Sequence, residues 1–408
     1  MRECRMCKSK ELELFLDLEF HPPSDAFLAK EELEKPETYY PLTVYMCGNC
    51  GLMQLGYVVP ANVLYDKSYP YESSMTSTGR SHFFEMSREI CTKFELEKGS
   101  LVVDVGSNVG VLLSGFKQHG MKVLGVDPAP TIAKIANDNG IETWPEFFNY
   151  NIARKIAKEK GRASVITATN VFAHIDNLDD FMKAVGHLLD EDGILVIEAP
   201  YFADLVENLE YDTIYHEHLG YMSVKPLTLF FPRFGMEVFD IKKFDIHGGS
   251  LRVFAGRKGK RAISENVGKF LKLEEEKQLY SIKRLKKFAN DVKNHRNELL
   301  DMLYGLKKEG KSIVGVSAPA KGNTLLNYCR IGTNVLDYLT EKSKIKAGLY
   351  SPGMHIPVVP DEQLLKDKPD YALLLAWNFA DEIMKNLKEF KSAGGKFIIP
   401  IPKPRIVE

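Results

Sequence analysis

The sequence has 408 residues, of which 44% are hydrophobic and 27% are charged, an ordinary globular composition that is sufficient for two or three domains. Its 54 Lys and Arg residues against 55 Asp and Glu leave a formal charge of −1, which argues against a nucleic-acid partner or an anionic membrane surface. The longest apolar stretches, such as residues 372–377, are far shorter than the roughly 18 residues that cross a bilayer. The charged N-terminus lacks the apolar core of a signal peptide, so we expect a cytoplasmic protein with reduced thiols.

Residues 1–70 contain short strand-like pieces and turn residues, and too few apolar residues for a core of their own. Two C-x2-C pairs lie in this segment, with 39 residues between them: Cys4, Cys7, Cys47 and Cys50. Tetrahedral zinc takes four thiolates, and a C-x2-C turn lets two sulfurs converge on one metal. The alternative is two unrelated cysteine turns. We predict a zinc module whose metal is structural, since four sulfurs leave no open coordination position.

The hydrophobic pattern of the sequence changes at residue 101. From there, apolar runs typical of buried strands alternate with helical patterns. A parallel sheet is predicted from four runs, at 101–105, 122–126, 163–168 and 194–198. Residues 238–242 and 253–255 predict antiparallel strands that complete this sheet. Residues 264–308 predict one or two long helices. The strand-like runs 312–316, 347–350, 371–376 and 396–399 then predict a second, smaller α/β unit. We place the three parts at 1–70, 71–258 and 259–408.

The run from 101 to 110 predicts a strand, a glycine turn and the start of a helix, with Asp104, Gly106, Asn108 and Gly110 along it. It matches the dinucleotide fingerprint G-x-G-x-x-G poorly, and it resembles the D/E-x-G-x-x-x-G loop of class I S-adenosylmethionine methyltransferases. The next strand ends in Asp127, 21 residues after Gly106, where an acid accepts hydrogen bonds from ribose hydroxyls. The predicted strand at 163–168 opens into Asn170, at the expected edge of the methyl donor. Another nucleotide-binding α/β fold is the alternative.

A second cluster of polar residues spans 215–221. It holds Tyr215, His216, Glu217 and His218 in succession. On a strand the two histidines share a face and could bind a metal, but the sequence identifies no third ligand. A packing cluster without chemistry is a further alternative. We favour a role in general acid–base catalysis, because an imidazole exchanges protons near neutral pH. Its neighbours can orient it or bind a developing oxyanion.

Almost the whole chain resembles one family, the zinc-containing sugar-nucleotide C-methyltransferases that act at C-3′ of 4-keto-deoxysugars in deoxysugar biosynthesis. Besides the cysteine pairs, the matching segments are residues 69–74 (Tyr-Pro-Tyr-Glu-Ser-Ser), 106–110, 215–218, 247–252 (His-Gly-Gly-Ser-Leu-Arg), 318–327 and 351–357. The resemblance implies an α/β fold with a small zinc module, a Rossmann-like class I methyltransferase domain, long helices and a second Rossmann-like domain. One residue departs from the pattern, because Val109 replaces the Asp that members usually carry.

The resemblance also implies roles for single residues. His218 becomes the general base, with Tyr215 and Glu217 beside it and His174 reaching in from the strand at 163–168. The segment from Tyr71 to Ser74 is expected to close over the methyl donor. The last domain is expected to help hold the nucleotide sugar, and the residues assigned to substrate are His247, Lys321, Asn323, Asn327 and His355.

The expected reaction is base-catalysed enolate formation followed by methyl transfer to C-3′, with S-adenosylmethionine and structural zinc as cofactors and a nucleotide sugar as partner. Two other functions compete with it. One is an O- or N-methyltransferase on another small molecule or on RNA, although the near-zero net charge argues against RNA. The other is a scaffold that binds S-adenosylmethionine without catalysis, and the presence of Tyr215, Glu217 and His218 argues against it.

Overall fold

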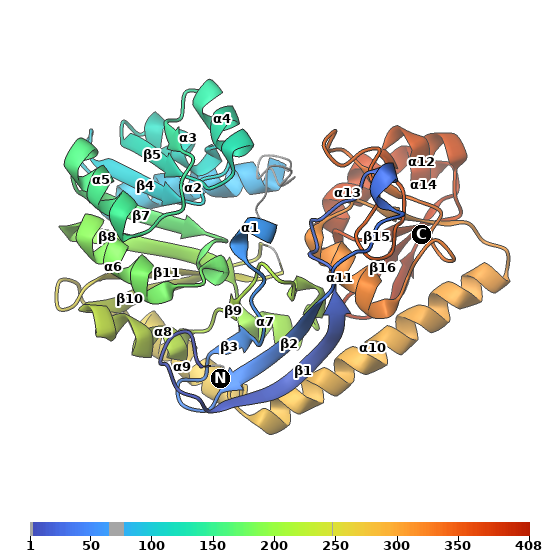
Figure 1. Cartoon of the computed structure of the whole chain (residues 1–408), viewed down its shortest axis with the longest axis horizontal. Helices are drawn as coiled ribbons and strands as arrows, with labels where there is room; N and C mark the ends of the chain where they lie inside the picture. The colour runs from blue at the N-terminus through green and yellow to red at the C-terminus, as the bar shows by residue number, and fades with distance from the viewer. Residues whose placement is uncertain (1–2, 65–76, 247) are drawn as a thin grey trace.

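The computed structural model describes residues 3–64, 77–246 and 248–408, and within them the strands form three sheets (Figure 1). The first sheet has the order β1-β2-β3-β9 and is antiparallel throughout. Its long hairpin pairs β1 (Leu12–His21) with β2 (Tyr40–Cys47), and β3 (Met53–Leu55) follows. The fourth strand, β9 (Gly220–Tyr221), comes from the middle of the chain, so the N-terminal module is built onto the segment that follows the histidine cluster.

The second sheet that the described residues form has the order β10-β11-β8-β7-β4-β5-β6. Its strands from β8 to β6 are parallel, while β11 runs antiparallel to both β8 and β10. This agrees with the antiparallel strands predicted to complete this sheet. The strands are β4 (Leu101–Val105), β5 (Lys122–Val126), β6 (Thr143–Trp144), β7 (Ala163–Thr169), β8 (Leu189–Pro200), β10 (Met236–Phe244) and β11 (Ser250–Arg257).

Helices connect these strands and cover the sheet. In α6 (Leu178–Leu188), Leu178, Phe181, Val185 and Leu188 recur at helical spacing and are all buried, which explains why this segment folds as an amphipathic helix against the sheet. The other helices before the linker are α1 (Ala61–Leu64), α2 (Ser77–Lys93), α3 (Val111–Gln118), α4 (Pro130–Asp138), α5 (Tyr150–Lys160), α7 (Phe202–Glu207) and α8 (Val224–Phe230).

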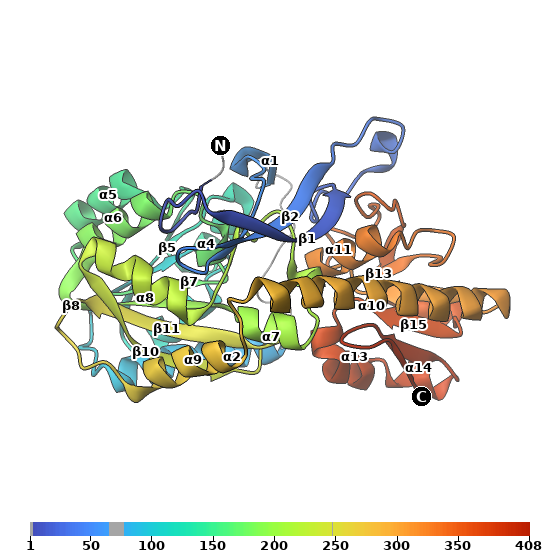
Figure 2. The same cartoon turned by 90° about the horizontal axis from the view of Figure 1, so that it is seen from below.

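The predicted long helices are α9 (Glu265–Glu276) and α10 (Ile282–Lys308). Helix α10 runs beneath the first sheet and on to the C-terminal domain, as both views show (Figures 1 and 2). Leu285, Phe288, Val292, Leu299 and Leu303 form its buried face. It therefore packs against both parts, since it contacts β1 at one side and α11 (Ala320–Cys329) at the other. None of the helices in the described residues is long and apolar enough to cross a membrane.

The third sheet, again counted over the described residues, has the order β14-β13-β12-β15-β16-β17, with only β17 antiparallel to its neighbour. Its strands are β12 (Ile313–Val316), β13 (Leu339–Glu341), β14 (Val358–Pro360), β15 (Tyr371–Leu374), β16 (Lys396–Ile399) and β17 (Arg405–Val407). Helices α12 (Glu362–Asp367), α13 (Ala380–Asn386) and α14 (Lys388–Ser392) accompany it.

One predicted strand of this domain is wrong. Residues 347–350 form a turn, and only Tyr350 makes isolated bridges, to Leu28 and Pro357. The sheet uses β13 and β14 instead, each three residues long. Three residues are too few to show an alternating hydrophobic pattern, so the sequence signal for them was weak.

Candidate active site and metal centre

The four cysteines of the N-terminal module converge on one point. Their sulfurs all lie within 4.8 Å of one another, with Cys4 Sγ 3.5 Å from Cys50 Sγ and Cys7 Sγ 3.5 Å from Cys47 Sγ. Zinc–sulfur bonds of about 2.3 Å in a tetrahedron separate the sulfurs by about 3.8 Å, so the set fits zinc. Each pair sits on a tight turn, because the carbonyls of Cys4 and Cys47 accept the N–H groups of Lys8 and Gly51.

The turn of the first cysteine pair also contacts the methyltransferase domain. The Arg5 guanidinium donates to Asp176 Oδ1 at 2.9 Å, and the Arg5 backbone N–H donates to Gln54 Oε1 at 2.9 Å. Asp176 lines the large cavity of that domain. The metal centre thus stabilises a loop that supports the wall of the cavity, without itself lying in it.

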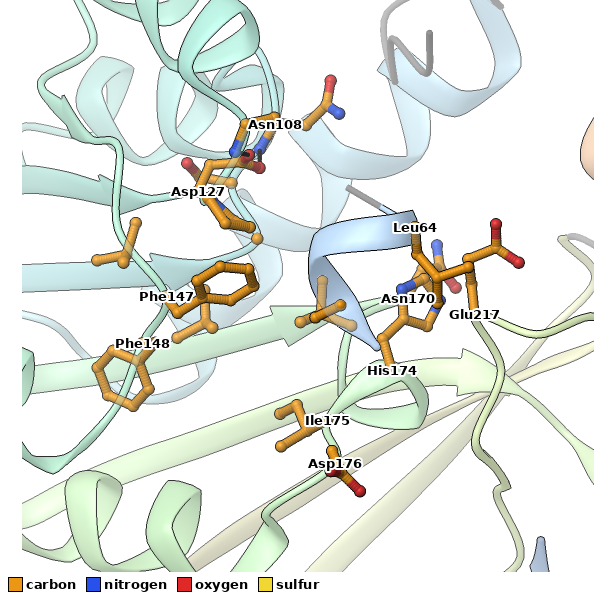
Figure 3. Close-up of a pocket in the computed structure, with 18 of the residues that line it drawn as sticks. Leu64, Asn108, Asp127, Phe147, Phe148, Asn170, His174, Ile175, Asp176 and Glu217 are labelled. Carbon is orange, nitrogen blue, oxygen red and sulfur yellow. Dashed lines mark hydrogen bonds between the residues drawn. The ribbon is translucent and has the colours of Figure 1, made fainter. Parts of the chain in front are cut away.

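The large cavity opens at the carboxyl ends of β4, β5 and β7 and has a volume of about 400 Å³ (Figure 3). Seven of the residues predicted from the sequence line it: Asp104, Gly106, Asn108, Asp127, Asn170, His174 and Glu217. Gly110 does not line the cavity but precedes α3 as its N-cap, with φ +81°. The parallel sheet explains this convergence, since the loops after neighbouring parallel strands meet at one edge.

The glycine loop has a shape that larger residues would not allow. Gly106 has φ +65°, and a Cβ placed on it would lie 2.2 Å from Val171 Cγ2. A Cβ on Gly110 would lie 2.9 Å from Ile141 Cγ2. Val109, the residue that departs from the family pattern, is buried in an apolar cluster with Ala129 and does not line the cavity. The substitution therefore leaves the lining of the cavity unchanged.

Two buried carboxylates lie next to the glycine loop, and one of them, Asp127, bonds to it. Asp127 Oδ2 accepts the backbone N–H of Asn108 at 2.9 Å, and its Oδ1 accepts that of Ala129 at 3.0 Å, while burial raises its pKa. Asp104 Oδ1 accepts the Thr167 hydroxyl at 2.6 Å, and burial raises the pKa of Asp104 to about 7. Asp127 therefore joins the glycine loop to the start of α4 while facing the cavity.

The histidine segment is a turn and not a strand. The His218 N–H donates to the Tyr215 carbonyl at 2.9 Å, and residues 216 and 217 form the bend. The interpretation that His216 and His218 share one strand face is therefore wrong. Within the residues that the structure describes, the only group with metal-binding geometry is the four cysteines.

His218 is held in one ring orientation. Its Nδ1 lies 2.7 Å from the carbonyl oxygen of Thr213, which can only accept a hydrogen bond. Neutral His218 therefore carries its proton on Nδ1, and Nε2 holds the basic lone pair. The ring lies 4.0 Å from the Tyr215 ring and 5.0 Å from the His174 ring, centroid to centroid. Burial lowers the pKa of His174 to about 4, so His174 is neutral.

Glu217 is the buried acid of the segment. It is 2% exposed, lines the cavity and accepts the Ser24 hydroxyl at 3.2 Å through Oε2. Its Oε1 has no hydrogen-bond partner in the described part of the chain. Burial, and then the charge of Asp25, raise the pKa of Glu217 to about 8. At neutral pH it is therefore mainly a protonated carboxylic acid that can donate a hydrogen bond.

His216 faces away from the large cavity. Its ring makes an edge contact with Tyr40, and burial lowers its pKa to about 4. It borders a narrow gap that Tyr215 also lines, together with the predicted substrate residues Asn323 and Asn327. The gap thus joins the histidine segment to α11 of the C-terminal domain.

The residues predicted to bind substrate do not gather around one cavity. Asn323 Nδ2 donates to the Ser24 carbonyl at 2.7 Å, and Asn327 Nδ2 donates to the carbonyls of Asn323 and Pro352. Lys321 lines neither cavity. His355 pairs with Glu37 of the hairpin at 3.0 Å and likewise lines neither cavity. Tyr71, Ser74 and His247 lie outside the described residues.

The structure adds aromatic residues to the cavity that the sequence did not reveal. Phe147 and Phe148 follow β6 and line the cavity beside Asn149, and Phe147 is 51% exposed (Figure 3). Because β6 has only two residues, no strand pattern marked the loop after it.

Comparison with known proteins identifies the family. C-methyltransferase NovU from Streptomyces niveus is 35% identical over 406 residues, which are 99% of this chain and 96% of that protein. The chain belongs to this C-methyltransferase family. Family models match in the same order: a zinc-binding domain at residues 4–65, a methyltransferase domain at 82–241 and the C-methyltransferase C-terminal domain at 245–402.

More distant matches cover only part of the chain. Ubiquinone biosynthesis O-methyltransferase from Azorhizobium caulinodans is 26% identical over 24% of this chain and 40% of that protein. Among solved structures, magnesium protoporphyrin IX methyltransferase from Synechocystis PCC 6803, with bound S-adenosylmethionine, covers 44% of this chain and 79% of its own at 14% identity and a TM-score of 0.33. A similarity this low adds nothing to the assignment.

Family membership confirms several expectations. The protein is an S-adenosylmethionine-dependent C-methyltransferase with a four-cysteine zinc site. Its α/β fold combines the zinc module, the class I methyltransferase domain and a C-terminal domain with a largely parallel sheet, as predicted. Its substrate is a small molecule that accepts a methyl group on carbon.

Proposed function

We propose that this enzyme methylates C-3′ of a nucleotide-linked 4-keto-deoxysugar through an enolate. A carbon atom must become nucleophilic before it can accept a methyl group, and a neighbouring ketone makes its proton removable. His218 is the base. The observation that carries this assignment is the 2.7 Å contact of His218 Nδ1 with the Thr213 carbonyl, because it leaves the basic lone pair on Nε2.

The proton and electrons balance in two steps. His218 Nε2 takes the C-3′ proton, the electron pair of the broken C–H bond forms the double bond between C-3′ and C-4′, and the π pair of the carbonyl moves onto the C-4′ oxygen. Tyr215 and protonated Glu217 stabilise this oxygen by donating hydrogen bonds, and neutral His174 completes the pocket. When bound, S-adenosylmethionine supplies an electrophilic methyl group, which C-3′ takes as the carbon–sulfur bond breaks.

The donor occupies the cavity of about 400 Å³ in this proposal. Asp127 accepts from the ribose, since each of its oxygens carries a second lone pair beyond its backbone bond. Four residues of the glycine loop and its surroundings line the rest of the donor cavity: Asp104, Gly106, Asn108 and Asn170. Gly110 contributes by shaping the loop before α3. Tyr71 and Ser74, which lie outside the described residues, are assigned to the donor by the family resemblance alone.

The C-terminal domain holds the nucleotide sugar, and the narrow gap beside His216 places Asn323 and Asn327 next to Tyr215. Lys321 offers a cation to the diphosphate, and His247 and His355 complete the assigned set. The corresponding domain limits are 1–70, 71–258 and 259–408.

Solvent exchange tests the order of the chemistry. The enzyme is incubated in deuterated water with a nucleotide-linked 4-keto-6-deoxysugar and S-adenosylhomocysteine, and the sugar is followed by NMR and mass spectrometry. We expect deuterium at C-3′ without methyl transfer, and we expect His218→Ala to abolish both exchange and methylation. His216→Ala is the matched control from the same turn, because the His216 ring packs against Tyr40 of the hairpin, whereas the His218 ring packs against Tyr215 and His174. Near-normal turnover by His218→Ala would contradict the assignment.

A further inference from the structure

The carbonyl that orients His218 belongs to a short helical turn, η3 (Tyr211–Thr213), which is buried throughout. The Thr213 backbone N–H donates to the Glu210 carbonyl at 3.0 Å, and the Thr213 side-chain oxygen has no partner among the described residues. The position of the Thr213 carbonyl therefore depends on how the two residues before it are held.

Both of those residues are held by the C-terminal half of the chain. The Tyr211 hydroxyl donates to His295 Nδ1 at 3.0 Å, because His295 Nε2 already donates to the Pro400 carbonyl at 2.7 Å. Asp212 Oδ2 accepts the indole N–H of Trp377 at 2.6 Å. Trp377 starts the turn η5 (Trp377–Phe379), which follows strand β15 of the third sheet.

Asp212 is fully buried, so its hydrogen bond to Trp377 is shielded from water. Burial raises the pKa of Asp212, and the nearby charge of Lys321 and the Trp377 bond oppose that rise. Lys321 Nζ lies 4.9 Å from the centre of the Trp377 ring and has no hydrogen-bond partner in the described ranges. Lys321, Trp377 and Asp212 thus form a chain of contacts from α11 to η3.

We propose that Asp212 and Trp377 are positioning residues for His218. Their hydrogen bond fixes η3, so that the Thr213 carbonyl holds the imidazole with its proton on Nδ1. The geometry of the base is then set by the C-terminal domain. This inference rests on the proposed function for the role of His218 as the base, but the structural link from Trp377 to His218 does not depend on the substrate.

Three variants test the link. Trp377→Phe keeps an aromatic ring under Lys321 but removes the N–H donor, and Asp212→Asn keeps the shape of the acceptor without its charge. We expect each to lower kcat about 10- to 100-fold, the scale on which small misplacements act, with KM for the sugar changed less than about twofold. The double variant should lose no more activity than the less active of the two single variants, because both changes act on the same hydrogen bond.

Trp144→Phe is the matched control. Trp144 also donates its indole N–H to a carboxylate, Glu142 Oε1 at 3.2 Å, but at an exposed site on β6 that does not line the cavity. We expect kcat of this variant within about twofold of the unchanged enzyme, because a single exposed hydrogen bond contributes little. Additive losses in Asp212→Asn/Trp377→Phe, or a raised KM with unchanged kcat, would overturn the proposal.

A second measurement needs no turnover. Nitrogen-15 NMR of histidine-labelled enzyme, with the His218 signals identified by their loss in His218→Ala, reports which ring nitrogen carries the proton. We expect one Nδ1–H form in the unchanged enzyme and in Trp144→Phe, and a mixture of both forms in Trp377→Phe. An unchanged His218 form in Trp377→Phe would overturn the positioning role. If the 4-keto sugar is not methylated at all, the proposed function fails while this readout still decides the link.

Discussion

Glu217 makes the stability of this protein depend on pH in a way that can be calculated. Burial, and then the charge of Asp25, raise its pKa from 4.5 to about 8. The folded protein therefore keeps a proton on Glu217 that the unfolded chain has already lost. Stability from this source is complete below pH 4.5 and is lost as the pH rises towards 8. Glu217→Gln removes the titration while keeping the shape and the hydrogen-bonding capacity of the side chain.

The size of the effect follows from the shift. Each pH unit between the two pKa values costs about 1.4 kcal/mol of unfolding free energy, which gives about 2 kcal/mol by pH 6 and about 5 kcal/mol by pH 9. Because Glu217 is 2% exposed, solvent screens little of this cost. Relative to the unchanged protein, Glu217→Gln should therefore gain about 3 kcal/mol in unfolding free energy between pH 6 and pH 9.

Urea unfolding of zinc-loaded protein at pH 6 and pH 9, followed by circular dichroism, measures this difference. Glu142→Gln is the control, because a hydrogen bond from Lys160 lowers the pKa of the exposed Glu142. Its difference from the unchanged protein should stay constant between pH 6 and pH 9. If Glu217→Gln and the unchanged protein lose stability in parallel over this range, Glu217 is ionised in the folded state and the reasoning about its burial is refuted.

Three further predictions concern the metal, the donor and the oxyanion. Metal analysis of the purified protein should find one zinc per chain. Limited proteolysis should show that Cys47→Ser exposes the N-terminal module to protease. In a turnover assay, enzyme with cobalt in place of zinc should be nearly as active as the zinc enzyme. Asp127→Ala should weaken binding of S-adenosylmethionine by about 1.5–3 kcal/mol in calorimetry, whereas Ser264→Ala, which removes a helix cap outside the cavity, should cost only stability, about 1 kcal/mol. Tyr215→Phe should lower kcat about 10²- to 10³-fold with substrate binding retained; an unchanged kcat would exclude Tyr215 as the oxyanion donor.

The sequence was informative where chemistry depends on short spacing. Two C-x2-C pairs define a zinc site almost by themselves, and the glycine loop with its strand-terminal acid locates a cavity, because parallel strands bring their loops to one edge. It failed where distant segments decide the conformation. The turn at residues 216–217 packs against Tyr40 and borders a gap that Asn323 also lines, and these two residues come from two other domains. No pattern within the segment itself records that arrangement.

The same dispersed contacts change how the structural zinc should be understood. The hairpin that the cysteines anchor carries Ser24, whose hydroxyl donates to Glu217 and whose carbonyl accepts from Asn323. One residue of the zinc module therefore touches both the histidine segment and α11 of the C-terminal domain. Since β2 ends at Cys47, loss of the metal frees one end of this hairpin. Zinc can thus take no part in the chemistry and still affect how Glu217 and Asn323 are placed, because both residues hydrogen-bond to Ser24 of the module that it stabilises.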